Sequence, residues 1–311
     1  MAEEFKGLNV LITGADGFIG SHLTKKLLEM GADVTCLVHS ENLKNLRSIK
    51  DRINLVYGDI TKRDMIDSIK ELNPDYIFHL AALTKADNYE NLREMLESNI
   101  TSTINIIEFA IRLKNLKRLI FSSTYLIYED SSESLGENAD INPKSIYALS
   151  KYTSEKVLQR YSDKYNLPIT ITRLFNVYGE NNINNVIFLF IKASINNKEM
   201  YIDGNGEQLR DFIYIDDVVE SFLLIAQKEE TMKKIINIGS GKYIKIKELA
   251  EKIKGLTKSS SKMIYRDFDP GLKNSYCDNT LLKTYGWKSK INIEEGLKRT
   301  IEWVKENENT I

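Results

Sequence analysis

The sequence predicts an α/β fold: a Rossmann-type, doubly wound parallel sheet with a smaller C-terminal α/β lobe. Two observations predict it. Short apolar runs alternate with helix-like stretches, and the first run leads directly into a glycine-rich segment. The clearest runs cover residues 8–12, 34–38 and 76–80. Runs without polar alternation are typical of strands covered on both faces, and strands separated by helices form parallel sheets.

The same alternation places the remaining elements of the first half of the chain. Strands are predicted at 54–57, 118–121 and 169–174, and long helices at 90–113 and 145–165. After residue 175 the alternation gives way to Asn-rich loops, irregular helices and a predicted hairpin around 203–206.

This change in pattern sets the expected domain organisation. We expect a first domain at 1–175 and a second, smaller lobe at 176–311. Apolar runs at 210–215 and 235–238 are expected to return to the main sheet, so segments near 210–240 would belong to the first domain.

Composition excludes several classes of protein. The 311 residues include 43 Lys and Arg against 44 Asp and Glu, so no global charge attracts the chain to nucleic acid or to an anionic membrane. Two cysteines, Cys36 and Cys277, are too few for a disulfide framework, and His22, His39 and His79 show no metal-ligand spacing. No apolar run approaches the roughly 18 residues of a membrane helix, and the acidic start argues against a signal peptide. We expect a soluble cytoplasmic protein with no metal.

The glycine-rich segment predicts a dinucleotide site. Gly14, Gly17 and Gly20 join the first strand to the first helix. Glycines in this place permit a tight turn, a close approach of backbone N–H groups to a pyrophosphate, and close contact between helix and sheet. The positive end of the helix then faces the phosphates.

The end of the second predicted strand leaves the choice of dinucleotide open. An acid about 20 residues beyond the glycines usually binds the adenosine ribose of NAD. Here His39 and Ser40 stand at that place instead, with Lys44 and Arg47 nearby. These residues could face a 2′-phosphate, so the cofactor is interpreted as NAD or NADP, with a tilt toward NADP.

A tyrosine and a lysine supply candidate proton-transfer chemistry. Tyr147 and Lys151 are four residues apart and share a helix face. A free tyrosine titrates near pH ~10, and an adjacent cation with an oxidised nicotinamide would favour the phenolate. Lowering the pKa of Tyr147 to around 7 needs about 4 kcal/mol. We expect a general base, or in reverse a general acid, for a sugar or alcohol hydroxyl.

Two other Tyr–Lys pairs have the same spacing, at 152/156 and 243/247. Context favours Tyr147, because a predicted strand ending in Ser122, Ser123 and Thr124 supplies hydroxyls about one helix earlier, at the carboxyl edge of the sheet.

Five ordered motifs carry a family resemblance: the glycine loop, Phe121–Thr124, Tyr147–Lys151, Arg173–Gly179 and Arg210–Asp217. Together they resemble the extended short-chain dehydrogenase/reductases, in the branch of UDP-galactose 4-epimerase-like nucleotide-sugar epimerases and dehydratases. The resemblance covers nearly the whole chain. It implies a nucleotide-diphosphate sugar as substrate and a homodimer formed through the helices at 90–113 and 145–165.

The resemblance also implies a role for individual residues. Thr124, Tyr147 and Lys151 would be catalytic, with Thr124 bonded to the reacting sugar oxygen and Lys151 to the nicotinamide ribose. Asn176 and Arg210 would contact the substrate diphosphate. The cofactor would be held by Gly14, Gly17, Phe18, Ile19, Gly20, His39, Ser40, Asp59, Ile60, Ala81, Ala82, Asn99, Ser122, Tyr147, Lys151 and Phe175.

Departures from the family pattern reduce the number of reactions that the sequence favours. Sugar 4,6-dehydratases follow the catalytic threonine with Asp-Glu, and UDP-glucuronate decarboxylases keep a glutamate at the second position. Tyr125 and Leu126 stand there in this chain. Asp269 replaces a family arginine that pairs with substrate phosphate, so Arg266 or Lys273 would have to substitute. A sugar-nucleotide 4-epimerase is favoured over an NAD(P)H-dependent 4-keto-6-deoxy-sugar reductase, and a non-catalytic dinucleotide sensor is the alternative from another class.

Overall fold

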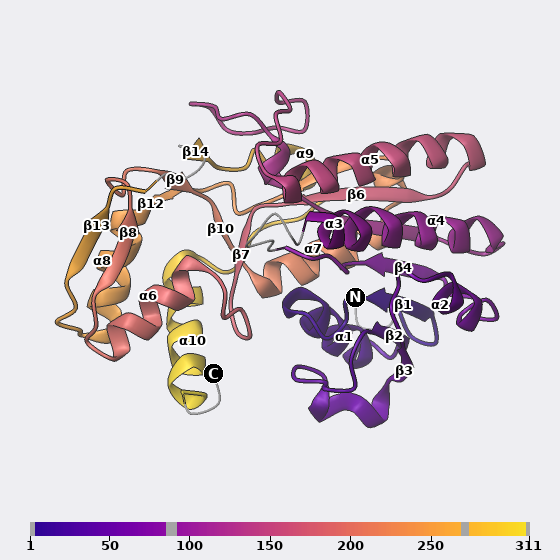
Figure 1. Ribbon diagram of the computed structural model, residues 1–311, viewed down its shortest axis with the longest axis horizontal. Coiled ribbons are helices and arrows are strands. Elements are labelled where there is room, and N and C mark those ends of the chain that lie inside the picture. The colour runs from indigo at the N-terminus through magenta and orange to yellow at the C-terminus, as the bar shows by residue number, and fades with distance from the viewer. Residues whose placement is uncertain (1–3, 85–91, 269–273, 309–311) are drawn as a thin grey trace. The chain divides into compact units, whose positions relative to one another are not determined.

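The chain forms two compact units. The computed structural model describes residues 4–84, 92–268 and 274–308 (Figure 1). Unit 1 consists of Met1–Glu129, Asp140–Arg173 and Val219–Ile236, and unit 2 of Asp130–Ala139, Leu174–Val218 and Asn237–Ile311.

Unit 1 is built on a seven-stranded sheet with the order β11-β6-β5-β4-β1-β2-β3. The strands are β1 (Asn9–Thr13), β2 (Asp33–Val38), β3 (Asn54–Tyr57), β4 (Tyr76–His79), β5 (Arg118–Thr124), β6 (Ile169–Leu174) and β11 (Ile235–Ile238). The pairings of β1 with β2 and β4, of β2 with β3 and of β4 with β5 are parallel. The order reverses beside β1, which creates the crevice where ligands bind in doubly wound sheets. The predicted fold class is confirmed.

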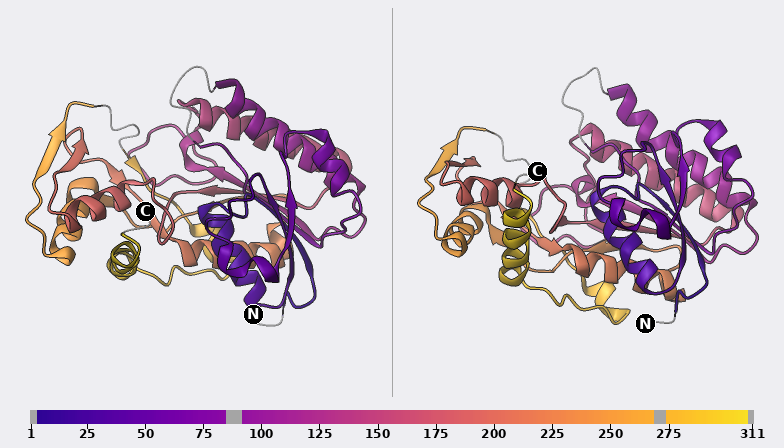
Figure 2. Two further views of the ribbon diagram at one scale, coloured as in Figure 1. Left: turned by 60° about the horizontal axis from the view of Figure 1, so that its bottom comes forward. Right: turned by 90° about the horizontal axis from the view of Figure 1, so that it is seen from below.

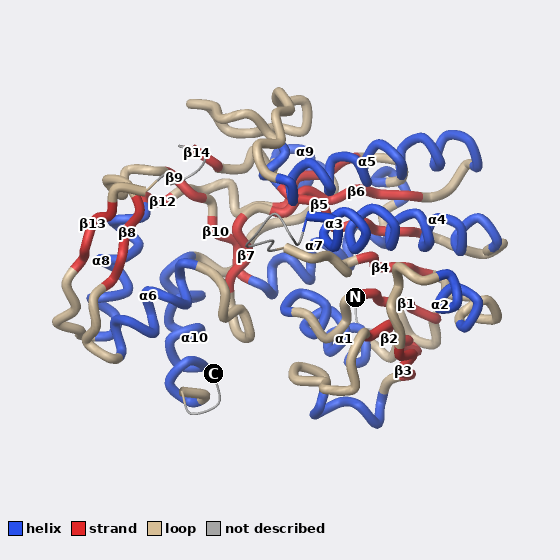
Figure 3. The backbone as a smooth tube through the Cα atoms, viewed as in Figure 1, coloured by secondary structure: helices blue, strands red, loops and turns tan. Residues whose placement is uncertain are grey.

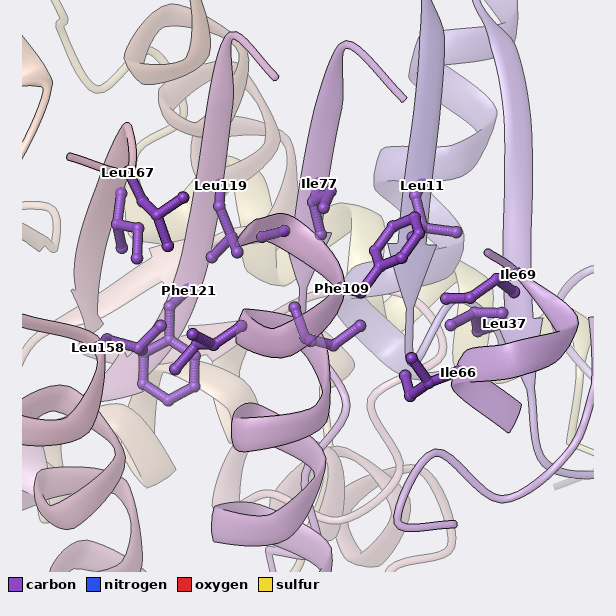
Figure 4. Close-up of a cluster of buried hydrophobic side chains, with 14 of the residues drawn as sticks. Leu11, Leu37, Ile66, Ile69, Ile77, Phe109, Leu119, Phe121, Leu158 and Leu167 are labelled. Atoms are coloured by element: carbon purple, nitrogen blue, oxygen red, sulfur yellow. The ribbon is translucent and has the colours of Figure 1, made fainter. Parts of the chain in front are cut away.

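Helices cover both faces of this sheet (Figure 2). On one face, α2 (Arg63–Ser68), α4 (Ser102–Arg112) and α5 (Ile146–Tyr165) pack over a buried apolar cluster that includes Ile77, Phe109 and Leu158 (Figure 4). On the other face lie α1 (Phe18–Glu29) and α7 (Ile215–Gln227), where Phe222 contacts Phe78 with ring centroids 6.2 Å apart. Short helices η1 (Arg47–Arg52), η4 (Tyr125–Ile127) and η5 (Glu229–Thr231) complete this part of the chain.

Of the two long predicted helices, one is confirmed and the other is divided into three helical segments. The helix at 145–165 is confirmed as α5: the Ser145 hydroxyl accepts a hydrogen bond from the N–H of Ala148 (3.1 Å) at its start, and Asn166 adopts a left-handed conformation (φ 53°) at its end. The predicted helix at 90–113 is instead α3 (Leu92–Leu96), a π-helical turn at Glu97–Thr101 and α4. Such turns inside helices are often found at functional sites.

Unit 2 contains three small sheets and four helices within the described residues (Figure 3). β7 (Asn176–Tyr178) pairs with β10 (Phe212–Tyr214), β8 (Met200–Asp203) with β13 (Met263–Arg266), and β9 (Leu209–Arg210) with β12 (Ile244–Lys245) and β14 (Asn274–Ser275). The helices are α6 (Val186–Ile195), α8 (Ile246–Thr257), α9 (Thr280–Thr284) and α10 (Ile293–Glu306).

Two predictions for this region are wrong. The hairpin around 203–206 does not form, because β8 pairs with β13, while β9 pairs with β12 and β14. The intervening turn instead bonds to the start of α8, since the Gly206 carbonyl accepts from the N–H of Lys247 (3.0 Å). The run at 210–215 does not join the main sheet, since β10 pairs with β7; the run at 235–238 does join it, as β11.

Candidate active site

The glycine loop follows β1 and has no room for larger residues. Gly14 has a φ of +69°, and a Cβ there would lie 2.7 Å from the backbone nitrogen of Ala81. A Cβ on Gly20 would overlap the carbonyl oxygen of Gly14. Gly17 caps the start of α1. The loop therefore offers exposed backbone and a helix N-terminus, the features that a pyrophosphate requires.

A pocket of about 550 Å³ opens beside this loop within unit 1. It is lined by the segments that follow the carboxyl ends of β1, β2, β3 and β4, together with residues of α3 and the π-helical turn. The predicted cofactor residues that line it are Gly14, Gly17, His39, Ser40, Asp59, Ile60, Ala81 and Ala82. Its size and its glycine cradle fit a dinucleotide.

The other predicted cofactor residues lie elsewhere. Phe18, Ile19, Gly20, Asn99, Ser122, Tyr147 and Lys151 belong to unit 1 but are not part of this pocket wall, and Phe175 belongs to unit 2. The prediction that Lys44 and Arg47 face a 2′-phosphate has no support, because both side chains are exposed and neither lines the pocket.

Asn99, in the π-helical turn, joins the pocket wall to α5. Its side-chain oxygen accepts from the N–H of Leu83 (2.8 Å), and its amide nitrogen donates to the Leu83 carbonyl (3.0 Å) and to the Ser150 hydroxyl (2.8 Å). Ser150 in turn donates to the carbonyl of Tyr147 (2.8 Å). Asn99 therefore holds α5 in a fixed position relative to the loop that lines the pocket.

His79, at the end of β4, is a residue that sequence reasoning considered only as a metal ligand. It is fully buried, with Nδ1 2.7 Å from the Thr13 hydroxyl and Nε2 3.1 Å from the Thr103 hydroxyl. Burial, and secondarily the charge of Lys151, lowers the pKa of His79 to about 3. The ring is therefore neutral at physiological pH and supports the glycine loop and α4 through hydrogen bonds.

Unit 1 should become less stable at low pH because of this histidine. The unfolded chain binds a proton on His79 near pH ~6.5 and the folded chain only near 3, so its contribution is complete above 6.5 and is lost as the pH falls toward 3. The free energy of unfolding should fall by about 5 kcal/mol over the whole interval. We expect His79→Gln to be less stable than wild type at pH 7, with a difference that shrinks toward pH 4 in urea titrations. A difference that is constant over this range would contradict the assignment.

Tyr147 and Lys151 lie on the first two turns of α5. Lys151 is buried, with its Nζ 4.1 Å from the centre of the Phe121 ring on β5. Thr124 ends β5, and its hydroxyl accepts from the N–H of Leu126 (3.2 Å). Unit 1 thus carries all three predicted catalytic residues on β5 and α5.

The pKa values show how strongly burial acts on this pair. Burial, followed by the nearby Tyr125, raises the pKa of Tyr147 to about 12. The expected lowering by Lys151 together with an oxidised nicotinamide stays a prediction. Burial also lowers the pKa of Lys151 to about 7, although Glu155 opposes this shift. Desolvation thus disfavours both charged forms, the phenolate of Tyr147 and the ammonium of Lys151.

Glu155, one turn beyond Lys151, forms a buried ion pair. Its carboxylate accepts from Arg173 Nε (3.1 Å) and Arg173 Nη2 (2.7 Å), while Arg173 Nη1 donates to the Tyr128 hydroxyl (2.9 Å). Both charged side chains are at most 3% exposed. The i, i+4 spacing of Lys151 and Glu155 is the signal that could have revealed this residue from sequence.

The two competing Tyr–Lys pairs lie on the surface. Lys156 Nζ stands 5.0 Å from the centre of the Tyr152 ring, and the Lys156 side chain is exposed. Tyr243 is 57% exposed and belongs to unit 2. Neither pair has the buried lysine that distinguishes Tyr147 and Lys151.

Unit 2 contains a second pocket, of about 510 Å³, that includes Arg210. Four lysines share its wall, and none of the described residues in that wall carries a carboxylate; its charged residues are Arg210, Lys242, Lys283, Lys288 and Lys290. Asn176, also predicted to bind substrate, donates through its side-chain nitrogen to the Asp211 carbonyl (2.9 Å). Asp269 and Lys273 lie outside the described residues, whereas Arg266 is paired with Asp203.

The described residues hold neither a metal cluster nor a membrane-spanning helix. Within 4–84, 92–268 and 274–308, no three His, Cys, Asp or Glu side chains come together so that they could hold a metal ion. No helix in that part of the chain is long and apolar enough to cross a bilayer.

Comparisons with known proteins agree with this geometry. The model of the NAD dependent epimerase/dehydratase family matches residues 10–239. This chain belongs to the NAD-dependent epimerase/dehydratase family. It is 34% identical over 311 residues to a Methanocaldococcus jannaschii protein named "Putative UDP-glucose 4-epimerase", covering 97% of this chain and 100% of that protein. It is 33% identical over 322 residues to the UDP-N-acetyl-alpha-D-glucosaminuronate decarboxylase of Bacillus cytotoxicus, covering 96% and 98%.

A solved structure of an epimerase/dehydratase family protein is similar throughout. The crystal structure of UDP-glucose 4-epimerase with UDP-glucose from Thermotoga maritima superposes with a TM-score of 0.90 and 30% identity, covering 96% of this chain and 99% of that one. The resemblance to the extended short-chain dehydrogenase/reductases is thereby confirmed, as is the interpretation as an enzyme. The family description names NAD, one of the two cofactors that the sequence left open.

Proposed function

We propose that this protein is a nucleotide-sugar 4-epimerase that uses NAD. The observation that carries the proposal is the set of Thr124, Tyr147 and Lys151 on β5 and α5, with no carboxylate following Thr124. Tyr125 and Leu126 form the start of η4 at the two positions where elimination or decarboxylation chemistry uses acids. The UDP-sugars in the names of the relatives and of the solved neighbour favour a UDP-sugar as substrate.

Each residue has a defined task in this reaction. NAD, when bound, supplies the hydride acceptor and a positively charged ring. Tyr147 removes the proton from the sugar C4 hydroxyl and later returns it, while the Thr124 hydroxyl bonds to the same oxygen as charge develops there. The Tyr147 pKa must fall from about 12 toward 7, a change of about 7 kcal/mol, and the Lys151 ammonium contributes to it.

The second pocket, in unit 2, is the proposed site for the substrate phosphates. We propose that Arg210 and Asn176 hold the diphosphate, and the lysines that share the pocket with Arg210 support this role because they favour an anionic ligand. The lysines of this pocket could therefore supply the positive charge that the family arginine, replaced by Asp269 in this sequence, would otherwise bring.

We further propose a homodimer formed through α4 and α5. At the start of α5, Ile146 and Leu149 lie on neighbouring positions of the helix surface and are 41% and 44% exposed; at its end Tyr165 is 42% exposed and stacks on Tyr161. Exposed apolar residues of this kind support an interface along the helix. Sedimentation as a monomer at micromolar concentration would contradict this proposal.

One experiment separates the epimerase from the reductase. Freshly purified protein is denatured, the released dinucleotide is identified, and UDP-glucose, UDP-galactose and their uronic acids are followed by NMR for inversion at C4. We expect retained NAD and inversion of at least one sugar without added cofactor. An empty site, with turnover only of a 4-keto-6-deoxy sugar and added NAD(P)H, would support the reductase, and a silent panel with intact cofactor binding would support the sensor.

A further inference from the structure

Asp16 lines the nucleotide pocket beside the end of β2. β1 and β2 pair in parallel, with Thr13 opposite Leu37, so the glycine loop and His39 emerge at the same edge of the sheet. Asp16, His39 and Ser40 all line the pocket there. The residues that follow the second strand of such folds face the ribose 2′ position. No acid stands at the end of β2 itself.

Backbone amides hold the Asp16 side chain in place. Its Oδ1 accepts from the N–H of Asn45 (2.9 Å) and of Leu46 (3.1 Å), and its Oδ2 from the N–H of Lys44 (3.2 Å). The Asn45 side chain also donates to the Asp16 carbonyl (2.7 Å). The carboxylate is thereby fixed between the glycine loop and the segment after β2, and within the described residues its donors are neutral groups.

The surrounding charges add to this negative potential. Among the described residues, four carboxylates line the pocket, those of Asp16, Asp59, Glu94 and Glu97, against one lysine, Lys62. Burial disfavours the ionised form of Asp59, but the hydroxyl and amide of Thr61, with smaller contributions from His39 and Lys62, keep the pKa of Asp59 below its usual value. Glu97 is paired with Arg93 at 3.3 Å, so its charge is partly balanced.

We propose that Asp16 selects NAD over NADP. The carboxylate tolerates the 2′-hydroxyl of NAD, which can donate a hydrogen bond, and repels the 2′-phosphate of NADP. In other dinucleotide-binding folds an acid at the end of the second strand distinguishes NAD from NADP. Here Asp16 would do so from the glycine loop. The inference rests on the proposed function only in that a nicotinamide dinucleotide occupies this pocket.

Binding rather than turnover tests the proposal. Dissociation constants of NAD and NADP are measured by calorimetry on the full chain, with bound dinucleotide first removed, for wild type, Asp16→Asn and the control Asp51→Asn. Asp51 is an exposed residue of η1 outside the pocket wall, so its variant matches the change in net charge. We expect wild type to bind NAD at least tenfold more tightly than NADP. Asp16→Asn should reduce this ratio about tenfold, and Asp51→Asn should leave it unchanged.

Salt provides a second test that needs no variant. Repulsion between a carboxylate and the 2′-phosphate is screened by ions, whereas pyrophosphate contacts are common to both dinucleotides and cancel in the ratio. From 20 to 500 mM KCl at pH 8, the preference of wild type for NAD should therefore fall. A preference that stays constant or rises with salt would overturn the proposal even if Asp16→Asn failed to fold.

The outcomes separate this inference from the proposed function. Equal affinity of wild type for both dinucleotides, or a ratio unchanged in folded Asp16→Asn, overturns the role of Asp16 and leaves the epimerase intact. Binding of neither dinucleotide overturns both. Loss of C4 inversion with the NAD preference intact rejects only the epimerase.

Discussion

Tyr147→Phe should reduce turnover roughly a thousandfold, within the range of about 10²–10⁴ that general acid–base catalysis contributes. The substitution removes only the phenolic oxygen, so NAD affinity measured by calorimetry should remain within about twofold of wild type. The readout is the rate of C4 inversion at saturating UDP-sugar.

Tyr152→Phe is the matched control for this variant. Tyr152 lies on the same helix and contacts Lys156, whose Nζ is 5.0 Å from its ring centre, but this pair lies at the surface. Its loss should leave turnover unchanged. Near-normal turnover in Tyr147→Phe, or an equal loss in both variants, would reject Tyr147 as the acid and base.

Glu155→Gln is expected to have the largest effect on stability. The variant leaves the buried guanidinium of Arg173 without a counter-charge, and removing one partner of a buried ion pair costs about 3–5 kcal/mol. The measurement is the free energy of unfolding in urea. Lys151 also loses the carboxylate that raises its pKa, so its ammonium is lost at a lower pH, and the remaining folded enzyme should be slower than wild type near pH 7.

An exposed pair on α10 provides the control for Glu155. Glu294 accepts from Lys298 Nζ at 2.8 Å, and both side chains are about half exposed. Glu294→Gln should leave the unfolding curve unchanged, because solvated ion pairs contribute little. Equal stability of the two variants would show that the Arg173–Glu155 pair does not stabilise unit 1.

The sequence was most informative where spacing determines geometry. The glycines after β1 and the alternation of strands and helices predicted the sheet and the loop, because these patterns depend on local backbone requirements. Other residues of the pocket wall, such as Asp59 and Ala81, came from the family resemblance. The tyrosine and lysine could be placed on one helix face because of their spacing, and the buried side of α5 separates them from the 152/156 pair.

Properties that depend on distant contacts could not be predicted in this way. Asp16 is one of the variable positions between the glycines, and its role depends on amides 28 to 30 residues away. The direction of the Tyr147 pKa shift depends on desolvation, which spacing does not reveal. The residues around 203–206 are typical of a hairpin turn, but β8 pairs with β13, about 60 residues further along the chain.

The hydrogen bonds of Asn99 bear on how this enzyme could be re-engineered. Substitutions around Leu83 would displace the helix that carries the reacting phenol, so a change intended for cofactor affinity would also alter chemistry. His39 and Ser40 line another part of the pocket wall. Asn99 forms no described hydrogen bond with either of them. Redesign of dinucleotide preference is therefore best attempted from that part of the wall, where affinity can change while the geometry of proton transfer is conserved.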